Sequence, residues 1–434
     1  MSLQIRLAFY PHGNASRRAE TSFSGVFIAL VLGTGVVLAA FLFNRERPQL
    51  GLDQPTVTLV RATGKCAECH RRETSAIIHQ FESSQHVAKG VNCLDCHRPQ
   101  DGQESTDHRG FEIAKELTAK NCAQCHSTEY TQFLRSRHAA PSWAAVAGRH
   151  DFTAEQIEFA EQYHPGAVNR GANQLALLEG EAAITKGCAA CHEIGKPNSD
   201  GSIGTCTACH ARHSSSIALA REPQTCGQCH MGPDHSQLEI YNESKHGVIF
   251  NAQKHSFHLD ADPKKLTTKD MSVPTCSTCH MSGLEGQKVT HDTSERLSWY
   301  LFAHVSTKRA NYTAARDEMQ ETCLKCHAQQ QVTQFYEEAE QVVASTNEHV
   351  EQVRQIVQSL RADGLLTPEP FDEPIEFLFF DYWHYYGRTA KHGAFMGGAD
   401  FVQWHGNYEL LKMKVEIEAM AAAIRREATA ASAE

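Results

Sequence analysis

The chain has 434 residues, and its 51 aspartate and glutamate residues outnumber its 41 lysine and arginine residues, so the formal net charge is −10. An acidic chain without a run of lysine or arginine is a poor match for nucleic acid, which excludes that class of partner. The chain also has 16 cysteines and 26 histidines. All sixteen cysteines fall in eight Cys-X-X-Cys-His motifs, which leaves none for a disulfide or a free thiol.

The first element in the chain is an apolar segment. Residues 23–43 carry no charged side chain, and this length is close to the roughly 20 residues that a helix needs to cross a bilayer. Because Arg6, Arg17 and Arg18 precede it, we predict a cytoplasmic segment 1–22, an inner-membrane anchor 23–43 and an exported remainder. The alternative is a cleaved signal peptide, although the apolar run is long for one. Both alternatives place the rest of the chain in the periplasm.

The eight motifs follow at irregular intervals of 18 to 66 residues, which excludes a solenoid of identical repeats. Cys-X-X-Cys-His is the attachment sequence of c-type haem, in which both thiols bond to the porphyrin and the histidine binds the iron. A zinc site or a redox-active dithiol would not need the histidine every time. The motifs therefore predict eight covalent haems with iron. The predicted attachment residues are Cys66, Cys69 and His70; Cys93, Cys96 and His97; Cys122, Cys125 and His126; Cys188, Cys191 and His192; Cys206, Cys209 and His210; Cys226, Cys229 and His230; Cys276, Cys279 and His280; and Cys323, Cys326 and His327.

The predicted fold is mostly α-helical, with the haems supplying much of the apolar core of an octahaem domain at 44–330. Strand signals are sparse. Beyond the last motif, residues 331–360 have apolar side chains at helical spacing, and the sequence Arg-Ala-Asp-Gly ending at Gly364 predicts the stop of that helix. A second helix is predicted at 408–426. The C-terminal segment 331–434 is therefore expected to supply long helices, distal ligands and subunit contacts.

Eighteen histidines lie outside the motifs. An electron-transfer haem usually takes a second axial ligand, whereas a haem that performs chemistry needs an open position. Eighteen histidines are enough to give seven haems a second histidine ligand and to leave one haem open. For each of these histidines, the alternative is an ordinary hydrogen-bonded side chain that binds no iron. The predicted distal ligands are His86, His138, His213, His246, His291, His392 and His405. Other histidines, such as His12, His108, His150 and His349, are expected on the surface.

One short segment, Met231-Gly-Pro-Asp-His, follows the sixth motif and suits a chemical role. A carboxylate next to an imidazole can form a proton-transfer pair at a substrate pocket, which makes Asp234 and His235 candidate catalytic residues. The alternative is that His235 is another haem ligand and that Asp234 is its hydrogen-bond partner.

The eight motifs, the Gly-Pro-Asp-His segment and the segment Lys391–Glu409 together resemble the octahaem hydroxylamine oxidoreductase family over about Cys66 to Ala423. The resemblance implies a mostly helical fold whose last five haems are similar to those of the pentahaem nitrite reductases. It implies that the haem of His192 is catalytic, with an open distal side lined by Asp234 and His235. It also implies a homotrimer.

The resemblance leaves the direction of the reaction open. Members that oxidise hydroxylamine carry a tyrosine of a neighbouring subunit bonded to the catalytic haem, and members without it resemble reductases that form ammonium from nitrite or hydroxylamine. Between His392 and His405 there is no tyrosine; Tyr382, Tyr385 and Tyr386 lie just before that stretch and Tyr408 just after it, and the sequence singles out none of them. The predicted anchor favours reduction of a small nitrogen compound, with a membrane quinone or a soluble cytochrome as redox partner. The alternatives are a hydroxylamine or hydrazine dehydrogenase and an electron conduit without a substrate.

Overall fold

The structure, a computed structural model, describes residues 31–35, 38 and 59–433. The chain divides into two units, Met1–Val57 and Thr58–Glu434. In the first unit, residues 31–35 and 38 are helical. The predicted segment 1–22 and most of the predicted anchor 23–43 lie outside the described residues. Among the helices that are described, none combines the length and the apolar character needed to cross a membrane.

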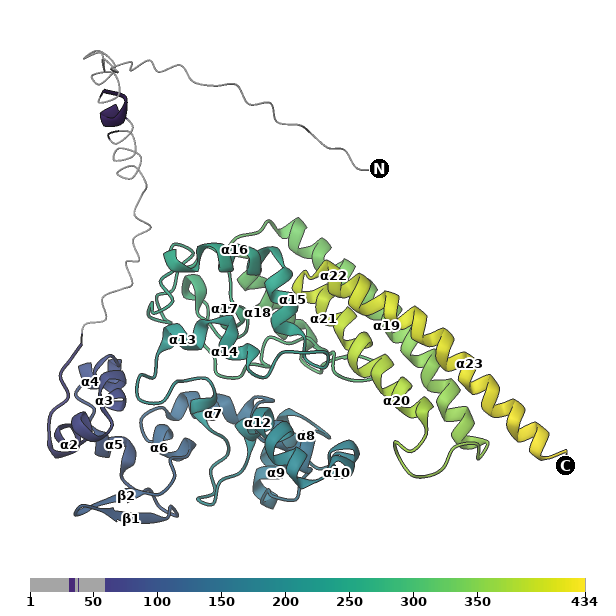
Figure 1. Ribbon diagram of the computed structural model, residues 1–434, viewed down its shortest axis with the longest axis horizontal. Helices are drawn as coiled ribbons and strands as arrows, with labels where there is room; N and C mark the ends of the chain where they lie inside the picture. Colours follow the sequence, from purple (N-terminus) through teal and green to yellow (C-terminus); the bar gives the residue numbers. More distant parts are fainter. Residues whose placement is uncertain (1–30, 36–37, 39–58, 434) are drawn as a thin grey trace, which may run out of the picture. The chain divides into compact units, whose positions relative to one another are not determined.

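Short helices and one hairpin form the first part of the second unit (Figure 1). The elements are α2 (Lys65–Glu73), α3 (Ser75–Glu82), α4 (Gln85–Ala88), α5 (Cys93–His97), β1 (Ser105–His108), β2 (Phe111–Ala114), α6 (Ala119–Ala123) and α7 (Ser127–Arg135). Arg109 and Gly110, with φ values of 56° and 84°, join β1 to β2 in a two-residue turn. Positive φ at both positions suits a tight antiparallel hairpin, and it pairs His108 with Phe111.

The middle of the chain continues with short helices. They are α8 (Ala140–Ala147), α9 (Ala154–Tyr163), α10 (Gln174–Glu179), α11 (Glu181–Ala183), α12 (Ala189–His192), α13 (Ile217–Arg221), α14 (Pro223–Gly227), α15 (Gln237–Glu243), α16 (Lys245–Gln253), α17 (Cys276–His280) and α18 (Tyr312–Leu324). Single 3₁₀ turns lie at Glu193–Gly195, Cys206–Ala208, Lys254–Ser256 and Leu284–Gly286, and a π-helical turn lies at Ile184–Cys188. Strands β3 (Trp299–Tyr300) and β4 (Thr307–Lys308) pair antiparallel. We call the loop that joins them, residues 301–306, the hairpin tip.

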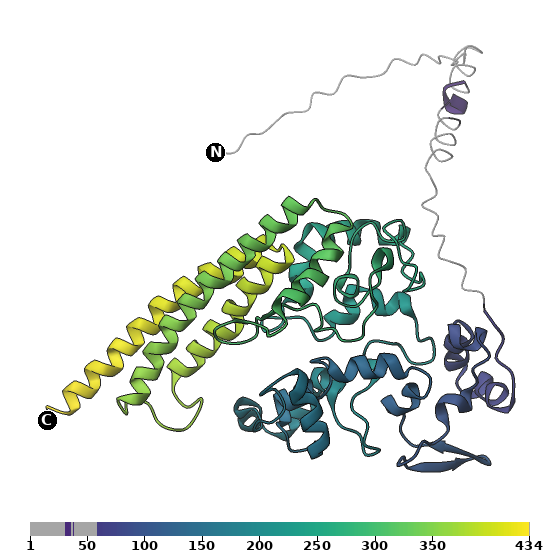
Figure 2. The ribbon, with the colours of Figure 1, turned by 180° about the vertical axis from the view of Figure 1, so that it is seen from behind.

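The C-terminal part forms a helical bundle in which α19 and α23 run side by side (Figures 1 and 2). Its elements are α19 (Gln329–Ala362), α20 (Pro374–Asp381), α21 (Arg388–Met396), α22 (Ala399–Val402) and α23 (Tyr408–Ala431), with π-helical turns at Tyr382–Gly387 and Gln403–Asn407. Both predicted C-terminal helices are confirmed. The stop is confirmed too, because Gly364 has φ 70° and the Leu365 N–H donates to the Leu360 carbonyl.

The apolar core of the second unit is divided into four clusters of buried side chains. The largest lies in the bundle, where Val350, Val353 and Leu360 of α19 pack against Leu410 and Ile417 of α23. Each such side chain contributes about 1.5–3 kcal/mol when it is fully buried. The mostly helical fold is therefore confirmed, and the strands among the described residues are confined to short pairs.

Candidate active site

Three of the eight attachment motifs lie within one helix each, namely the motif of Cys66 in α2, that of Cys93 in α5 and that of Cys276 in α17. Helix α5 spans Cys93–His97 and α17 spans Cys276–His280, and capping boxes at Asn92 and Thr275 fix where these helices begin. Residues i, i+3 and i+4 share one face of a helix, so the two thiols and the imidazole of a motif project to the same side. This is the arrangement that attachment through two thiols and ligation by the histidine require.

Six of the eight motif histidines face a second imidazole ring at a narrow range of distances, 5.8–6.5 Å between ring centroids. The pairs are His70 with His108 (6.0 Å), His126 with His86 (6.1 Å), His97 with His213 (6.5 Å), His210 with His291 (6.4 Å), His230 with His138 (5.8 Å) and His327 with His246 (5.9 Å). The ring of His230 also has that of His235 at 5.9 Å. Two imidazoles bound to opposite faces of one iron by bonds of about 2 Å have centroids roughly 6 Å apart. The observed spacing fits a haem iron between the rings of each pair.

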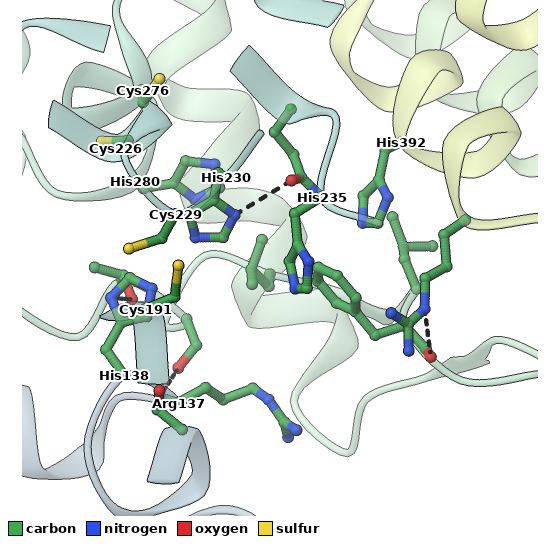
Figure 3. Close-up of a pocket in the computed structure, with 18 of the residues that line it drawn as sticks. Arg137, His138, Cys191, Cys226, Cys229, His230, His235, Cys276, His280 and His392 are labelled. Carbon is green, nitrogen blue, oxygen red and sulfur yellow. Dashed lines mark hydrogen bonds between the residues drawn. The ribbon is translucent and has the colours of Figure 1, made fainter. Parts of the chain in front are cut away.

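A cavity of 2740 Å³ runs through the second unit. It is lined by cysteines and histidines of the last six motifs, some of which appear in Figure 3. A largely apolar cavity with attachment thiols and imidazoles on its walls fits covalently bound porphyrins. The motif cysteines and histidines would hold these haems, which supply electron transfer and, at an open iron position, substrate binding.

Five of the seven predicted distal histidines belong to the ring pairs described above. Among the described residues, His392 and His405 contact no other histidine ring. The buried ring of His392 lies 4.7 Å from the ring of Phe302, and burial lowers its pKa to about 3. The side chain of His405 is 60% exposed, with its Nε2 atom 3.2 Å from a carboxylate oxygen of Asp400. His108, expected to be a surface residue, is exposed, and the β1–β2 turn also brings it to face His70.

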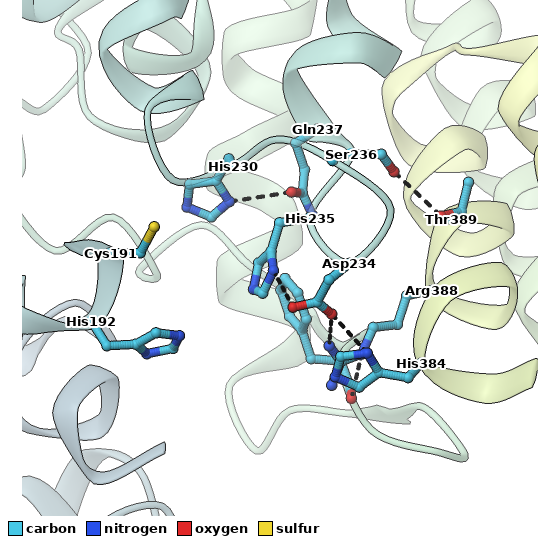
Figure 4. Close-up of polar contacts among 12 residues, drawn as sticks. Cys191, His192, His230, Asp234, His235, Ser236, Gln237, His384, Arg388 and Thr389 are labelled. Carbon is cyan, nitrogen blue, oxygen red and sulfur yellow. Dashed lines mark hydrogen bonds and ion pairs between the residues drawn. The ribbon is translucent and has the colours of Figure 1, made fainter. Parts of the chain in front are cut away.

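His192 and His280 are the two motif histidines whose rings lack such a partner within the described part of the chain. The Nδ1 atom of His192 lies 2.8 Å from the Ser142 carbonyl oxygen and donates to it, which leaves Nε2 free to bind a metal. Burial lowers the pKa of His192, and the charges of His235 and Asp234 also act on it. His192 is therefore the unpaired histidine that lies near the predicted catalytic pair (Figure 4).

Asp234 is the centre of a polar cluster. Its Oδ2 atom lies 2.5 Å from Nδ1 of His235, while its Oδ1 atom lies 2.9 Å from Nδ1 of His384 and 2.7 Å from a terminal nitrogen of Arg388 (Figure 4). Burial raises the pKa of Asp234, but hydrogen bonds from His235 and His384 outweigh burial and hold that pKa well below its ordinary value. Asp234 is therefore an anion that accepts a hydrogen bond from Arg388 and has an imidazole nitrogen of His235 and one of His384 within ion-pair distance.

His384 and Arg388 were not among the predicted site residues. They are four residues apart, on one helical face formed by the π-helical turn Tyr382–Gly387 and the start of α21, and that spacing was the available signal. The hairpin tip completes this side of the pocket, because the ring of Phe302 lies 5.3 Å from the ring of His235. Lys391 donates from its buried Nζ atom to the Ala303 carbonyl at 3.2 Å and to the Ser306 hydroxyl at 2.7 Å.

The four tyrosines of the C-terminal segment have different environments. Tyr382 is fully buried in the core of the bundle, and Tyr386 packs against that core. Tyr385 lines the cavity. Tyr408 is exposed and its ring lies 5.2 Å from that of Trp404. Burial and neighbouring carboxylates raise the pKa of Tyr385. Of these four tyrosines, Tyr385 is thus the one that lines the cavity of its own chain.

The sequence profile of seven-times multi-haem cytochromes with Cys-X-X-Cys-His motifs matches residues 89–374, a region that contains seven of the eight motifs. The chain belongs to this multi-haem cytochrome family. Membership implies covalent c-type haems with iron. Multi-haem c-type cytochromes are typically extracytoplasmic.

Individual relatives of this multi-haem cytochrome are similar at low identity. A probable nitrite reductase-hydroxylamine oxidoreductase fusion protein of Kuenenia stuttgartiensis is 23% identical over 372 residues, which cover 71% of this chain and 39% of the relative. Among solved structures, a hypothetical multiheme protein has a TM-score of 0.70 at 21% identity, covering 89% of this chain and 100% of its own. A reducing HAO-like protein complex of Kuenenia stuttgartiensis has a TM-score of 0.66 at 22% identity, covering 85% and 86%. The prediction of a multihaem cytochrome resembling hydroxylamine oxidoreductase is confirmed.

Proposed function

We propose that this cytochrome is an octahaem oxidoreductase that reduces nitrite or hydroxylamine to ammonium at an open haem held by Cys188, Cys191 and His192. The observation that carries the proposal is the environment of His192. Its ring faces no second imidazole in the described chain, and it lies within electrostatic range of Asp234 and His235. An iron position without a distal ligand, beside a proton-transfer pair, is what reduction of a small nitrogen compound needs.

In this proposal the haem at His192 supplies the binding position for the substrate nitrogen and delivers the electrons. The protein residues manage protons. His235 keeps one proton on its Nδ1 atom, directed at the Asp234 carboxylate, so its Nε2 atom is the one that can give a proton to substrate and take up another from solvent. Reduction of one nitrite to ammonium consumes six electrons and eight protons, so a relay that reloads between steps suits the reaction. The other seven haems would carry the electrons.

The reducing direction is supported by the names of two relatives, a nitrite reductase-hydroxylamine oxidoreductase fusion and a reducing HAO-like complex. The alternative is oxidation of hydroxylamine or hydrazine, which would need a tyrosine bonded to the catalytic haem by a neighbouring subunit. The exposed ring of Tyr408 is what favours that alternative, because it is available to a second copy of the chain.

We further propose that the protein is periplasmic, that segment 23–43 anchors it to the inner membrane, and that it exchanges electrons with the quinone pool or with a soluble cytochrome. A homotrimer is the proposed assembly. Its support is an exposed apolar face near the start of α23, formed by Trp404, Tyr408, Leu411 and Val415. Their spacing of three and four residues places them on one side of the helix, where a second copy could cover them.

The proposed relay is tested with His235→Ala, assayed for ammonium formation from nitrite with reduced methyl viologen as donor. We expect turnover to fall roughly 10²–10⁴-fold while the haem content stays unchanged. His150→Ala is the matched control, because His150 also adjoins an aspartate, with its Nδ1 atom 3.3 Å from the Asp151 carboxylate, but its side chain is 91% exposed. Full turnover by His235→Ala would refute the relay.

The open haem is tested by the spectrum of the ferric and dithionite-reduced protein together with its intact mass. The mass should correspond to eight attached haems per chain. A high-spin ferric component with ordinary reduced c-type bands is the expected result. A red-shifted reduced band together with a cross-linked mass would instead identify the oxidising enzyme. Absence of any high-spin component would identify an electron conduit.

A further inference from the structure

The Asp234 carboxylate is held from two sides. One oxygen faces His235, and the other is shared by His384 and Arg388, which come from the C-terminal bundle. We infer that Arg388 is a positioning residue, which acts on the proposed reaction by fixing the orientation and charge of Asp234 and, through it, of His235. The inference rests on the proposed function, because it concerns the same pocket.

Arg388 itself is fixed by several contacts. One terminal nitrogen donates to Asp234 at 2.7 Å, and its Nε atom donates to the Phe302 carbonyl at 3.1 Å. The guanidinium carbon lies 5.0 Å from the ring centroid of Phe302 and 4.9 Å from that of Trp383. A planar guanidinium that donates two directed hydrogen bonds and packs against two aromatic rings has little freedom to rotate. The carboxylate that it binds is therefore also fixed.

The two carboxylate oxygens of Asp234 have different partners, and this determines which nitrogen of His235 carries a proton. Because Oδ1 of Asp234 is occupied by Arg388 and His384, only Oδ2 is available to His235, and it accepts from Nδ1. The guanidinium charge also favours the ionised carboxylate, which cannot donate a hydrogen bond and so requires the proton to reside on His235 Nδ1. Without Arg388 the carboxylate could rotate, and His235 would lose its fixed tautomer and direction.

Arg388 also contacts the hairpin tip. Its role could therefore be only to hold that loop, and this must be distinguished from positioning Asp234. The tip has a second attachment to α21, because Lys391 donates to the Ala303 carbonyl and to the Ser306 hydroxyl. A third attachment of the hairpin tip comes from α19, where the side-chain amide of Asn347 donates to the Ser306 carbonyl at 2.8 Å. Removal of the guanidinium therefore leaves the tip tethered, while Asp234 loses its charged partner. A positioning residue should act only through Asp234.

The experiment is a double-mutant cycle on the full haem-loaded protein, with Arg388→Gln, Asp234→Asn and the double variant, assayed with nitrite and with hydroxylamine. We expect kcat to fall roughly 10–10²-fold in Arg388→Gln and roughly 10²–10⁴-fold in Asp234→Asn, with KM nearly unchanged. The double variant should be no slower than Asp234→Asn, because the two residues act as one unit. Multiplied losses in the double variant would overturn the inference.

Arg388→Lys provides a second variant that keeps the charge. An ammonium group can bond Asp234 or the Phe302 carbonyl but does not reproduce the planar fork, so kcat should lie between wild type and Arg388→Gln with all haems attached. Wild-type kcat in Arg388→Lys together with loss of haem from Arg388→Gln would show a purely structural role and refute positioning. Arg425→Gln, at an exposed ion pair with Asp363, is the matched control with wild-type kcat. A wild-type protein that reduces neither substrate would refute the proposed function instead.

Discussion

Gly195 provides a direct test of the geometry around His192. It lies in the 3₁₀ turn that follows the fourth motif and packs against the start of α8. A Cβ atom at this position would lie 1.9 Å from the Ala139 carbonyl oxygen and 2.7 Å from the His138 carbonyl oxygen. Since ordinary contacts begin at 3.4 Å, the two backbone segments would have to separate by about 1.5 Å in Gly195→Ala.

The size of the effect follows from what the two segments carry. One holds His192 and the other holds the Ser142 carbonyl that accepts its hydrogen bond at 2.8 Å, so a shift of this size breaks the bond and tilts the imidazole. Overpacking by one methyl group costs about 1–3 kcal/mol of stability. A misplacement of roughly 1 Å at a reacting centre costs on the order of 10²-fold in rate. We expect both losses in Gly195→Ala.

The assay compares Gly195→Ala with Gly171→Ala by thermal unfolding and by turnover of nitrite. Gly171 is a matched control because a Cβ there would have no neighbour within 4 Å, and its φ is not positive. Gly171→Ala should match wild type in both measurements. Equal unfolding temperatures and equal turnover of the two variants would refute the close packing of Gly195 against Ala139 and its link to His192.

Two further predictions concern other histidines. His108→Ala should turn the haem of His70 into a high-spin centre, whereas His405→Ala should leave every haem unchanged. Electron paramagnetic resonance of the ferric protein measures the high-spin signal in both variants. A new high-spin signal only in His405→Ala would show that His405, and not His108, is the haem ligand. Burial lowers the pKa of His164 to about 4 from an ordinary 6.5, so the unfolded chain binds a proton first on acidification. Stability conferred by neutral His164 is therefore present above pH 6.5 and is lost, by roughly 3 kcal/mol, as the pH falls to about 4. Thermal unfolding of His164→Gln should be less sensitive to pH across that window, and equal sensitivity would contradict the burial of His164.

Local features of the fold were predictable because short-range physics determines them. The end of α19 follows from the loss of apolar periodicity and from a glycine that can adopt a positive φ at Gly364. The motifs of Cys93 and Cys276 form helical turns because their spacing and their capping residues, Asn92 and Thr275, are contained within six positions. In the same way, the adjacency of Asp234 and His235 in the sequence made their hydrogen bond foreseeable.

Long-range pairing was not predictable from spacing. His108 reaches His70 only through the register of the β1–β2 hairpin, which depends on two residues with positive φ. His405 is a predicted ligand because glycine follows it, and the π-helical turn Gln403–Asn407 places its ring beside Asp400. Arg388 is separated from Asp234 by more than a hundred positions, and the sequence around neither residue predicts their contact.

The order of elements along the chain has a consequence for biogenesis. The last attachment motif ends at His327, whereas α21, which brings Arg388 to the pocket, comes later. A polypeptide exported from its N-terminus presents every attachment cysteine to the maturation machinery before α21 emerges. Under the proposed function, haem attachment would finish on a chain in which Arg388 is not yet beside Asp234, and the onset of activity would be tied to the completion of translocation.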